Sequence, residues 1–127
     1  MAPKIHPWQL LLVVILLDLV YFSLTYEIVY RRAIEATYGP HPFRWIPALL
    51  AWVCVAVGVW CVRDQPPAFR AVIGGSVFGV YNMTTASLSP HWPMATSLID
   101  SCWGAIVFAS APVLTQFLFS RFRALKR

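Results

Sequence analysis

Residues 46–62 read IPALLAWVCVAVGVWCV, an unbroken apolar run with no charged side chain on any face of a helix. A soluble helix of this length needs a polar outer face, because one side of it meets water. The run comes close to the roughly 20 apolar residues that cross about 30 Å of hydrocarbon. It therefore predicts a helix surrounded by lipid.

The composition of the whole chain extends this prediction. Hydrophobic residues make up 59% of the 127 residues and charged residues only 12%, against roughly 45–50% and about 25% in ordinary globular chains. A small soluble domain needs more polar residues than this, because much of its accessible surface faces water. We expect residues 1–127 to form a single membrane-embedded domain, with no separate soluble module.

Four apolar runs are separated by breaker-rich connections and cover roughly residues 8–29, 43–62, 68–88 and 94–119. Helices are expected, because unpaired backbone groups in lipid cost several kcal/mol each, and no alternating pattern typical of a β-barrel is visible. The first run continues too far for a cleaved signal peptide, so we expect it to be retained. Glu27, Arg31 and Glu35 are spaced to pair at i, i+4 and to extend the first helix beyond the membrane. The predicted class is an all-α, polytopic membrane protein with four transmembrane helices in a small bundle.

Lysine and arginine residues predict the orientation. Seven lie in the N-terminus, the 63–70 connection and the C-terminal tail, whereas three (Arg31, Arg32 and Arg44) lie on the opposite side. Both termini are therefore expected on the cytoplasmic-equivalent side, with the basic tail near anionic lipid headgroups. No nucleic-acid partner is expected, because no binding-fold signature accompanies the charge. A bacterial plasma membrane, a mitochondrial inner membrane and the internal membrane of a virion all remain open.

Four polar residues lie inside the runs at similar depths: Asp18 and Tyr21 in the first, Asn82 in the third and Asp100 in the fourth. A carboxylate in lipid is costly, so we expect these side chains to meet inside the bundle. They can form a proton or ion relay, or interhelical hydrogen bonds of about 0.6–2 kcal/mol each that fix the packing. The second interpretation is favoured, because the spans contain no third interior acid and no base.

Small residues predict where helices approach closely. Ala71, Gly75 and Gly79 form a small-xxx-small series in the third run, and Gly104 shares a face with Asp100 in the fourth. Such series permit close contact between helix backbones. We expect an intramolecular contact here, although a contact between subunits is the alternative.

The residues that usually carry catalysis or bind metals are scattered. His6, His41 and His91 are isolated in connections, without the spacing of metal ligands. No serine has a nearby His–Asp arrangement that could activate it. We therefore expect no metal, no cofactor and no enzymatic activity.

The third and fourth runs resemble an uncharacterised family of small four-helix membrane proteins, classified as a domain of unknown function. The resemblance rests on YNMTTASL at residues 81–88, on Trp92-Pro93 and on LIDSCWG at residues 98–104. Two positions depart from the family pattern, since Asn82 replaces an Asp and Thr85 an Asn. Losing a carboxylate at residue 82 weakens a proton relay, because an amide does not titrate. The resemblance implies four helices and no particular activity.

These observations favour a non-catalytic structural or accessory subunit of a larger membrane-embedded assembly, with other membrane proteins as partners. A small transporter or channel that uses the polar cluster around Asp18 and Asp100 is the alternative. An intramembrane enzyme acting on a lipid is a third, weaker hypothesis.

Overall fold

The computed structural model describes residues 5–125, without the side chains of Arg123 and Ala124, and all regular structure in that range is helical. The elements are α1 (Pro7–Thr25), the π-helical turn η1 (Tyr26–Tyr30), α2 (Arg31–Tyr38), α3 (Trp45–Val62), α4 (Pro67–Leu88) and α5 (Met94–Ala124). Lys4, Lys126 and Arg127, which contribute to the predicted charge bias, lie outside the described residues.

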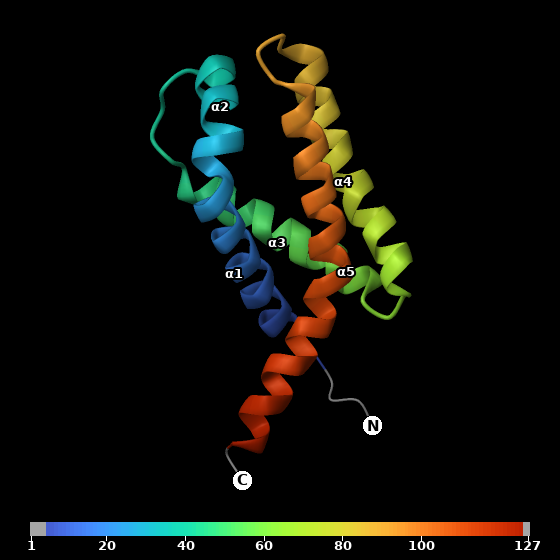
Figure 1. Ribbon diagram of the computed structural model, residues 1–127. Helices are drawn as coiled ribbons and strands as arrows, with labels where there is room; N and C mark the ends of the chain where they lie inside the picture. The colour runs from blue at the N-terminus through green and yellow to red at the C-terminus, as the bar shows by residue number, and fades with distance from the viewer. Residues whose placement is uncertain (1–4, 126–127) are drawn as a thin grey trace.

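The first helical unit is longer than the apolar run that predicts it. Elements α1, η1 and α2 follow one another without a break and rise together in Figure 1. Arg31 bonds to Glu27 at 2.9 Å and to Glu35 at 3.1 Å, as the spacing predicts. The unit ends at Gly39, whose φ of +74° lies in the left-handed region that a residue without Cβ adopts readily.

Three helical units of the described chain are long and apolar enough to cross a membrane: Pro7–Tyr38, Trp45–Val62 and Met94–Phe122. Helix α4 has the length, with 22 residues, but not the hydropathy. Its polar residues, which include Arg70, Asn82 and Thr85, lower its average. The prediction of four spans is thus supported for three of them.

Helices α4 and α5 form an antiparallel hairpin through the short connection at residues 89–93 (Figure 1). Their backbones approach most closely at Gly74 and Gly104. A Cβ built on Gly74 would collide with the carbonyl oxygen of Gly104 and with the side chain of Phe108. The hairpin therefore depends on glycine at both of these positions.

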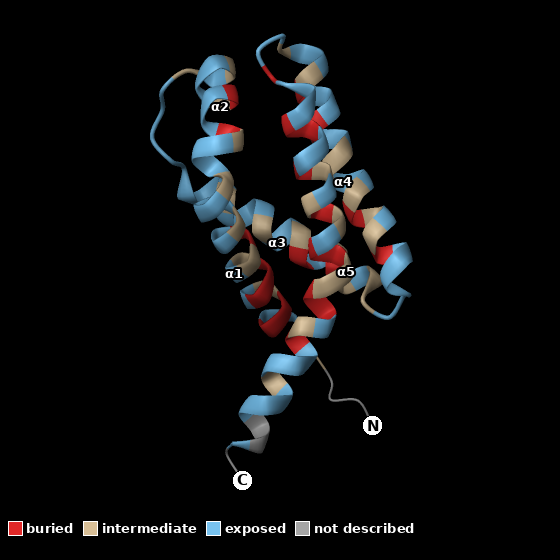
Figure 2. Cartoon of the chain, viewed as in Figure 1, coloured by how far each residue is buried: buried red, intermediate tan, exposed pale blue. Residues whose placement is uncertain are grey.

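The apolar core lies in the half of the bundle nearer the termini. Leu10 and Val14 of α1 pack with Val59 of α3 and with Phe108 of α5, and all four are buried. Figure 2 shows the buried positions of α1 gathered toward the lower, N-terminal end of that helix. Pro112 lies inside α5, and the end of α5 runs past the rest of the bundle. Asp18, Asn82 and Asp100, which are also buried, lie farther from the termini along their helices than this core.

Candidate functional site

Asp18 of α1 accepts hydrogen bonds from two indole rings. Nε1 of Trp52 in α3 lies 3.0 Å from Oδ2, and Nε1 of Trp103 in α5 lies 2.7 Å from Oδ1. The Asp18 residue is only 5% exposed. One carboxyl group thus connects three helices, and each of its oxygens faces an N–H donor.

Asp100 of α5 is held by two different donors. The hydroxyl of Tyr30 in η1 donates to Oδ1 at 2.6 Å, and Nδ2 of Asn82 in α4 donates to Oδ2 at 2.6 Å. This second carboxyl group connects the first helical unit to both helices of the hairpin.

Tyr21 lies between the two carboxyl groups. Its hydroxyl is 2.7 Å from that of Tyr30, and its ring stacks on Trp103 with centroids 4.1 Å apart and planes 5° apart. Because the single hydroxyl hydrogen of Tyr30 is used on Asp100, Tyr21 is the donor to Tyr30. An ordered chain of O–H groups therefore runs from Tyr21 through Tyr30 to Asp100.

Of the four residues expected to cluster, Tyr21, Asn82 and Asp100 belong to one hydrogen-bonded network, in which Tyr30 joins Tyr21 to Asp100 and Asp100 in turn accepts from Asn82. Asp18 sits beside them with its own two donors, and none of its hydrogen bonds goes to the other three. The carboxyl groups therefore occupy two neighbouring sites, joined through the stacked rings of Tyr21 and Trp103.

Sequence reasoning missed Tyr30, Trp52 and Trp103. Tyr30 lies one residue beyond the expected end of the first span, at residue 29. It follows Tyr21 by nine residues, which correspond to two and a half turns of α-helix. An uninterrupted α-helix would thus turn Tyr30 away from Tyr21. The wider turn of η1, in which the N–H of Arg31 bonds to the carbonyl of Tyr26, changes the register and brings the two hydroxyls together.

The amide of Asn82 is only partly satisfied. Its Nδ2 also donates to the carbonyl of Phe78 at 2.9 Å, whereas Oδ1 is buried without a partner. The backbone carbonyl of Asn82 accepts from Ser97 at 3.2 Å. An amide supplies the donor that the carboxyl group of Asp100 needs, which an ionised Asp at residue 82 would not.

The packing glycines lie partly where the sequence predicts. Gly104 is at the closest approach of the hairpin, but its partner is Gly74. A Cβ on Gly75 or Gly79 would make ordinary contacts at 3.6 Å with residues of α5. Ala71, the first member of the predicted series, is half-buried on the same helix.

Arg70 is the buried cation of α4, at 5% exposure. It donates to the carbonyls of Arg63 and Gln65 at 2.9 and 3.0 Å, beyond the end of α3, and to that of Ala109 in α5 at 2.7 Å. The guanidinium therefore links three segments through backbone oxygens, and its hydrogen bonds do not include either carboxyl group.

No group of three or more potential metal ligands was found among residues that the structure describes. The polar cluster consists of Asp18, Tyr21, Tyr30, Trp52, Asn82, Asp100 and Trp103. Most of its hydrogen-bond donors and acceptors bond to one another. Chemically, the arrangement can hold helices in register, and its O–H chain offers a path for a proton between Tyr21 and Asp100.

Comparison with known proteins gives one match. A family model described as a predicted membrane protein (DUF2177) covers residues 8–117, which include all of the residues of the polar cluster. No curated protein and no solved structure matches the chain.

Proposed function

From the premise that the chain belongs to the DUF2177 family of predicted membrane proteins, we propose that it is a non-catalytic structural or accessory subunit of a larger membrane-embedded assembly. The observation that supports this role is the use of both carboxyl groups as intramolecular acceptors. Asp18 is bonded to α3 and α5, and Asp100 to η1 and α4. Acidic groups used in this way fix the geometry of a scaffold.

The proposal includes α4 as a fourth span, with both termini on the cytoplasmic-equivalent side. At about 1.5 Å per residue, its 22 residues reach about 33 Å, which matches a hydrocarbon core. Its polar residues Arg70 and Asn82 are buried against other helices, whereas its exposed surface includes Val72 and Val80. Lipid would therefore meet an apolar face, despite the lower average hydropathy.

Size analysis of the protein in its native lipid tests the assembly. We would extract a tagged chain with a membrane-solubilising copolymer, without detergent, and measure particle mass and subunit stoichiometry. A tagged four-helix protein of unrelated sequence, at the same expression level, is the control. A defined partner present in fixed ratio, and absent from the control, is expected. Particles that contain only the free 14.3 kDa chain would contradict the proposal.

A small transporter or channel is the second candidate, and the O–H chain from Tyr21 through Tyr30 to Asp100 favours it. Proton flux into liposomes that contain the purified chain would test this candidate. Flux that disappears in Asp100→Asn and Tyr30→Phe, and persists in Tyr26→Phe, would establish transport. Absent flux, or flux that these changes leave unaltered, would eliminate it.

A further inference from the structure

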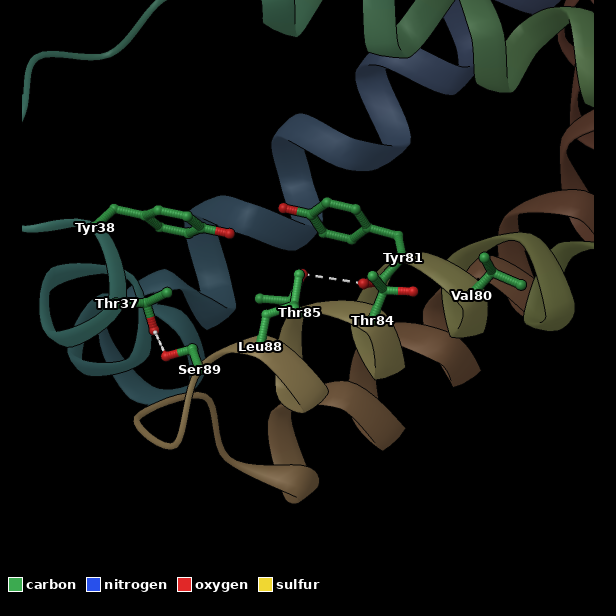
Figure 3. Close-up of a pocket in the computed structure, with 8 residues that line it drawn as sticks. All are labelled: Thr37, Tyr38, Val80, Tyr81, Thr84, Thr85, Leu88 and Ser89. Atoms are coloured by element: carbon green, nitrogen blue, oxygen red, sulfur yellow. Dashed lines mark hydrogen bonds between the residues drawn. The ribbon is translucent and has the colours of Figure 1, made fainter.

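A cavity of about 480 Å³ separates α2 from the last turns of α4. Figure 3 shows α2 contributing one wall and α4 the other. Its lining consists of Thr37, Tyr38, Val80, Tyr81, Thr84, Thr85, Leu88 and Ser89. Neither carboxyl group of the polar cluster belongs to this lining, so the cavity is a separate feature.

Six of the eight lining residues carry a hydroxyl group and none is charged. The hydroxyls of Thr37 and Ser89 pair with each other at 3.2 Å, and that of Thr85 donates to the carbonyl of Tyr81. In Figure 3 the phenol groups of Tyr38 and Tyr81 point toward one another from opposite walls. The cavity therefore offers hydroxyls that a ligand can use.

The size of the cavity selects the kind of occupant. An α-helix with side chains is about 10–12 Å across, so a volume of about 480 Å³ holds little more than one helical turn. The same volume falls within the range of about 300–1,000 Å³ that is usual for small-molecule sites. A headgroup-sized molecule fits better than the helix of a partner.

The position of the cavity indicates that this molecule comes from the bilayer. The cavity is lined by the last residues of α2 and of α4. Figure 1 shows these two helix ends at the end of the bundle opposite the termini, where a spanning bundle would meet the headgroup region. Val80 and Leu88 are 70% and 81% exposed, so the wall of the cavity continues into the lipid-facing surface of α4. No cation in the lining would attract a phosphate.

We propose that this cavity binds the uncharged, polyhydroxylated headgroup of a membrane lipid, of the glycosyl diacylglycerol class. The sugar exchanges hydrogen bonds with Tyr38, Tyr81 and Thr84, and one acyl chain follows the exposed surface of Val80 and Leu88. Binding of this kind does not depend on the accessory role proposed above, and it is compatible with transport as well.

Native mass spectrometry with defined lipids tests the proposal. The purified full chain is placed in nanodiscs with equal mole fractions of monoglucosyl diacylglycerol, phosphatidylcholine and phosphatidylglycerol that have matched acyl chains. We expect the glucosyl lipid to be retained in preference to both phospholipids. Removing one hydroxyl in Tyr38→Phe or Tyr81→Phe should weaken binding by roughly twofold to tenfold. The matched control is Tyr26→Phe, an exposed tyrosine outside the cavity.

Three outcomes would overturn the proposal. Equal retention of phosphatidylglycerol would show that the site does not select an uncharged headgroup. Unchanged preference in the Tyr38→Phe/Tyr81→Phe double variant would place the lipid elsewhere. A photo-crosslinker introduced at Thr84 in native membranes that captures a protein and no lipid would assign the cavity to a partner chain instead.

Discussion

Tyr30 donates a hydrogen bond of 2.6 Å to Asp100, although 70 positions of sequence separate them. Close to this bond, the hydroxyl of Thr96 donates to the carbonyl of Val29 at 3.3 Å. These contacts hold η1 against α5 immediately before α2 begins. They therefore join the first helical unit to the hairpin at the level where the cavity beside α2 opens.

The Tyr30→Phe variant should unfold more readily than the wild type. The change leaves Oδ1 of Asp100 without its donor and removes the partner of Tyr21. A buried acceptor left unsatisfied costs about 1–3 kcal/mol. Unfolding in mixed micelles of increasing SDS fraction measures this loss. Tyr26→Phe, on the same π-helical turn, is the control and should unfold like the wild type; equal stability of the two variants would contradict the role of Tyr30.

The Asp18→Asn variant should be destabilised by about 1–3 kcal/mol, although its shape is nearly conserved. Both oxygens of Asp18 accept from indole N–H groups, and an amide presents one N–H₂ group that cannot accept. The same SDS titration, together with tryptophan fluorescence, to which Trp52 and Trp103 contribute among the six tryptophans, reports the change. Asp64→Asn at an exposed carboxylate serves as the control. A variant as stable as the wild type would contradict a stabilising role for the two indole hydrogen bonds.

Alanine substitutions should show which glycines of the hairpin its packing requires. In Gly74→Ala and Gly104→Ala the new methyl group meets backbone oxygen and a large side chain, and overpacking costs typically about 1–3 kcal/mol. In Gly79→Ala the nearest atom is the hydroxyl oxygen of Ser101 at 3.6 Å, so little should change. The three variants are ranked by the fraction of protein that still elutes as a monodisperse peak in size-exclusion chromatography after heating in detergent. Greater damage from Gly79→Ala than from Gly74→Ala would contradict the observed register.

The packing of α4 shows what the sequence could and could not predict. A motif search finds Gly75 and Gly79, which are spaced at i, i+4, and a straight helix places Gly75 seven residues before Asn82 on the same face. The contacts instead follow the row Arg70, Gly74, Phe78 and Asn82. The predicted series Ala71, Gly75 and Gly79 is also a row at i, i+4, so both rows have the same inclination to the helix axis and differ by one residue. Which of two neighbouring rows faces α5 is a property of the pair of helices, so the spacing of small residues in α4 alone does not contain it.

The polar cluster likewise has a part that the sequence predicts and a part that it does not. Burial cost and depth predict that Asp18 and Asp100 face inward, because both arguments use only local composition and length. The donors that satisfy them depend on side-chain reach and on the register of η1. Tyr30 reaches Asp100 only because a π-helical turn interrupts the helix, and the sequence of Tyr26–Tyr30 carries no signal for it that we recognise.

Arg70→Met should destabilise the end of the bundle nearer the termini. Methionine keeps much of the length and packing of the side chain, but it leaves the carbonyls of Arg63, Gln65 and Ala109 without the guanidinium. We expect the free energy of unfolding to fall by about 1–3 kcal/mol. Most of this loss should come from the carbonyl of Ala109, because it lies within the bundle and loses its donor. Amide hydrogen exchange should increase at the 63–66 connection, since two of the three bonds hold that segment.

Lysine at the same position distinguishes charge from shape. Arg70→Lys retains the positive charge, but a single ammonium group cannot reproduce the fork that spans carbonyls of the connection and of α5. We therefore expect it to recover only part of the stability lost in Arg70→Met. The control is Arg32→Met at an exposed arginine, which should leave both measurements unchanged. Full recovery by lysine would show that the charge alone stabilises this end of the bundle, and a stable Arg70→Met variant would show that the three carbonyl contacts contribute little.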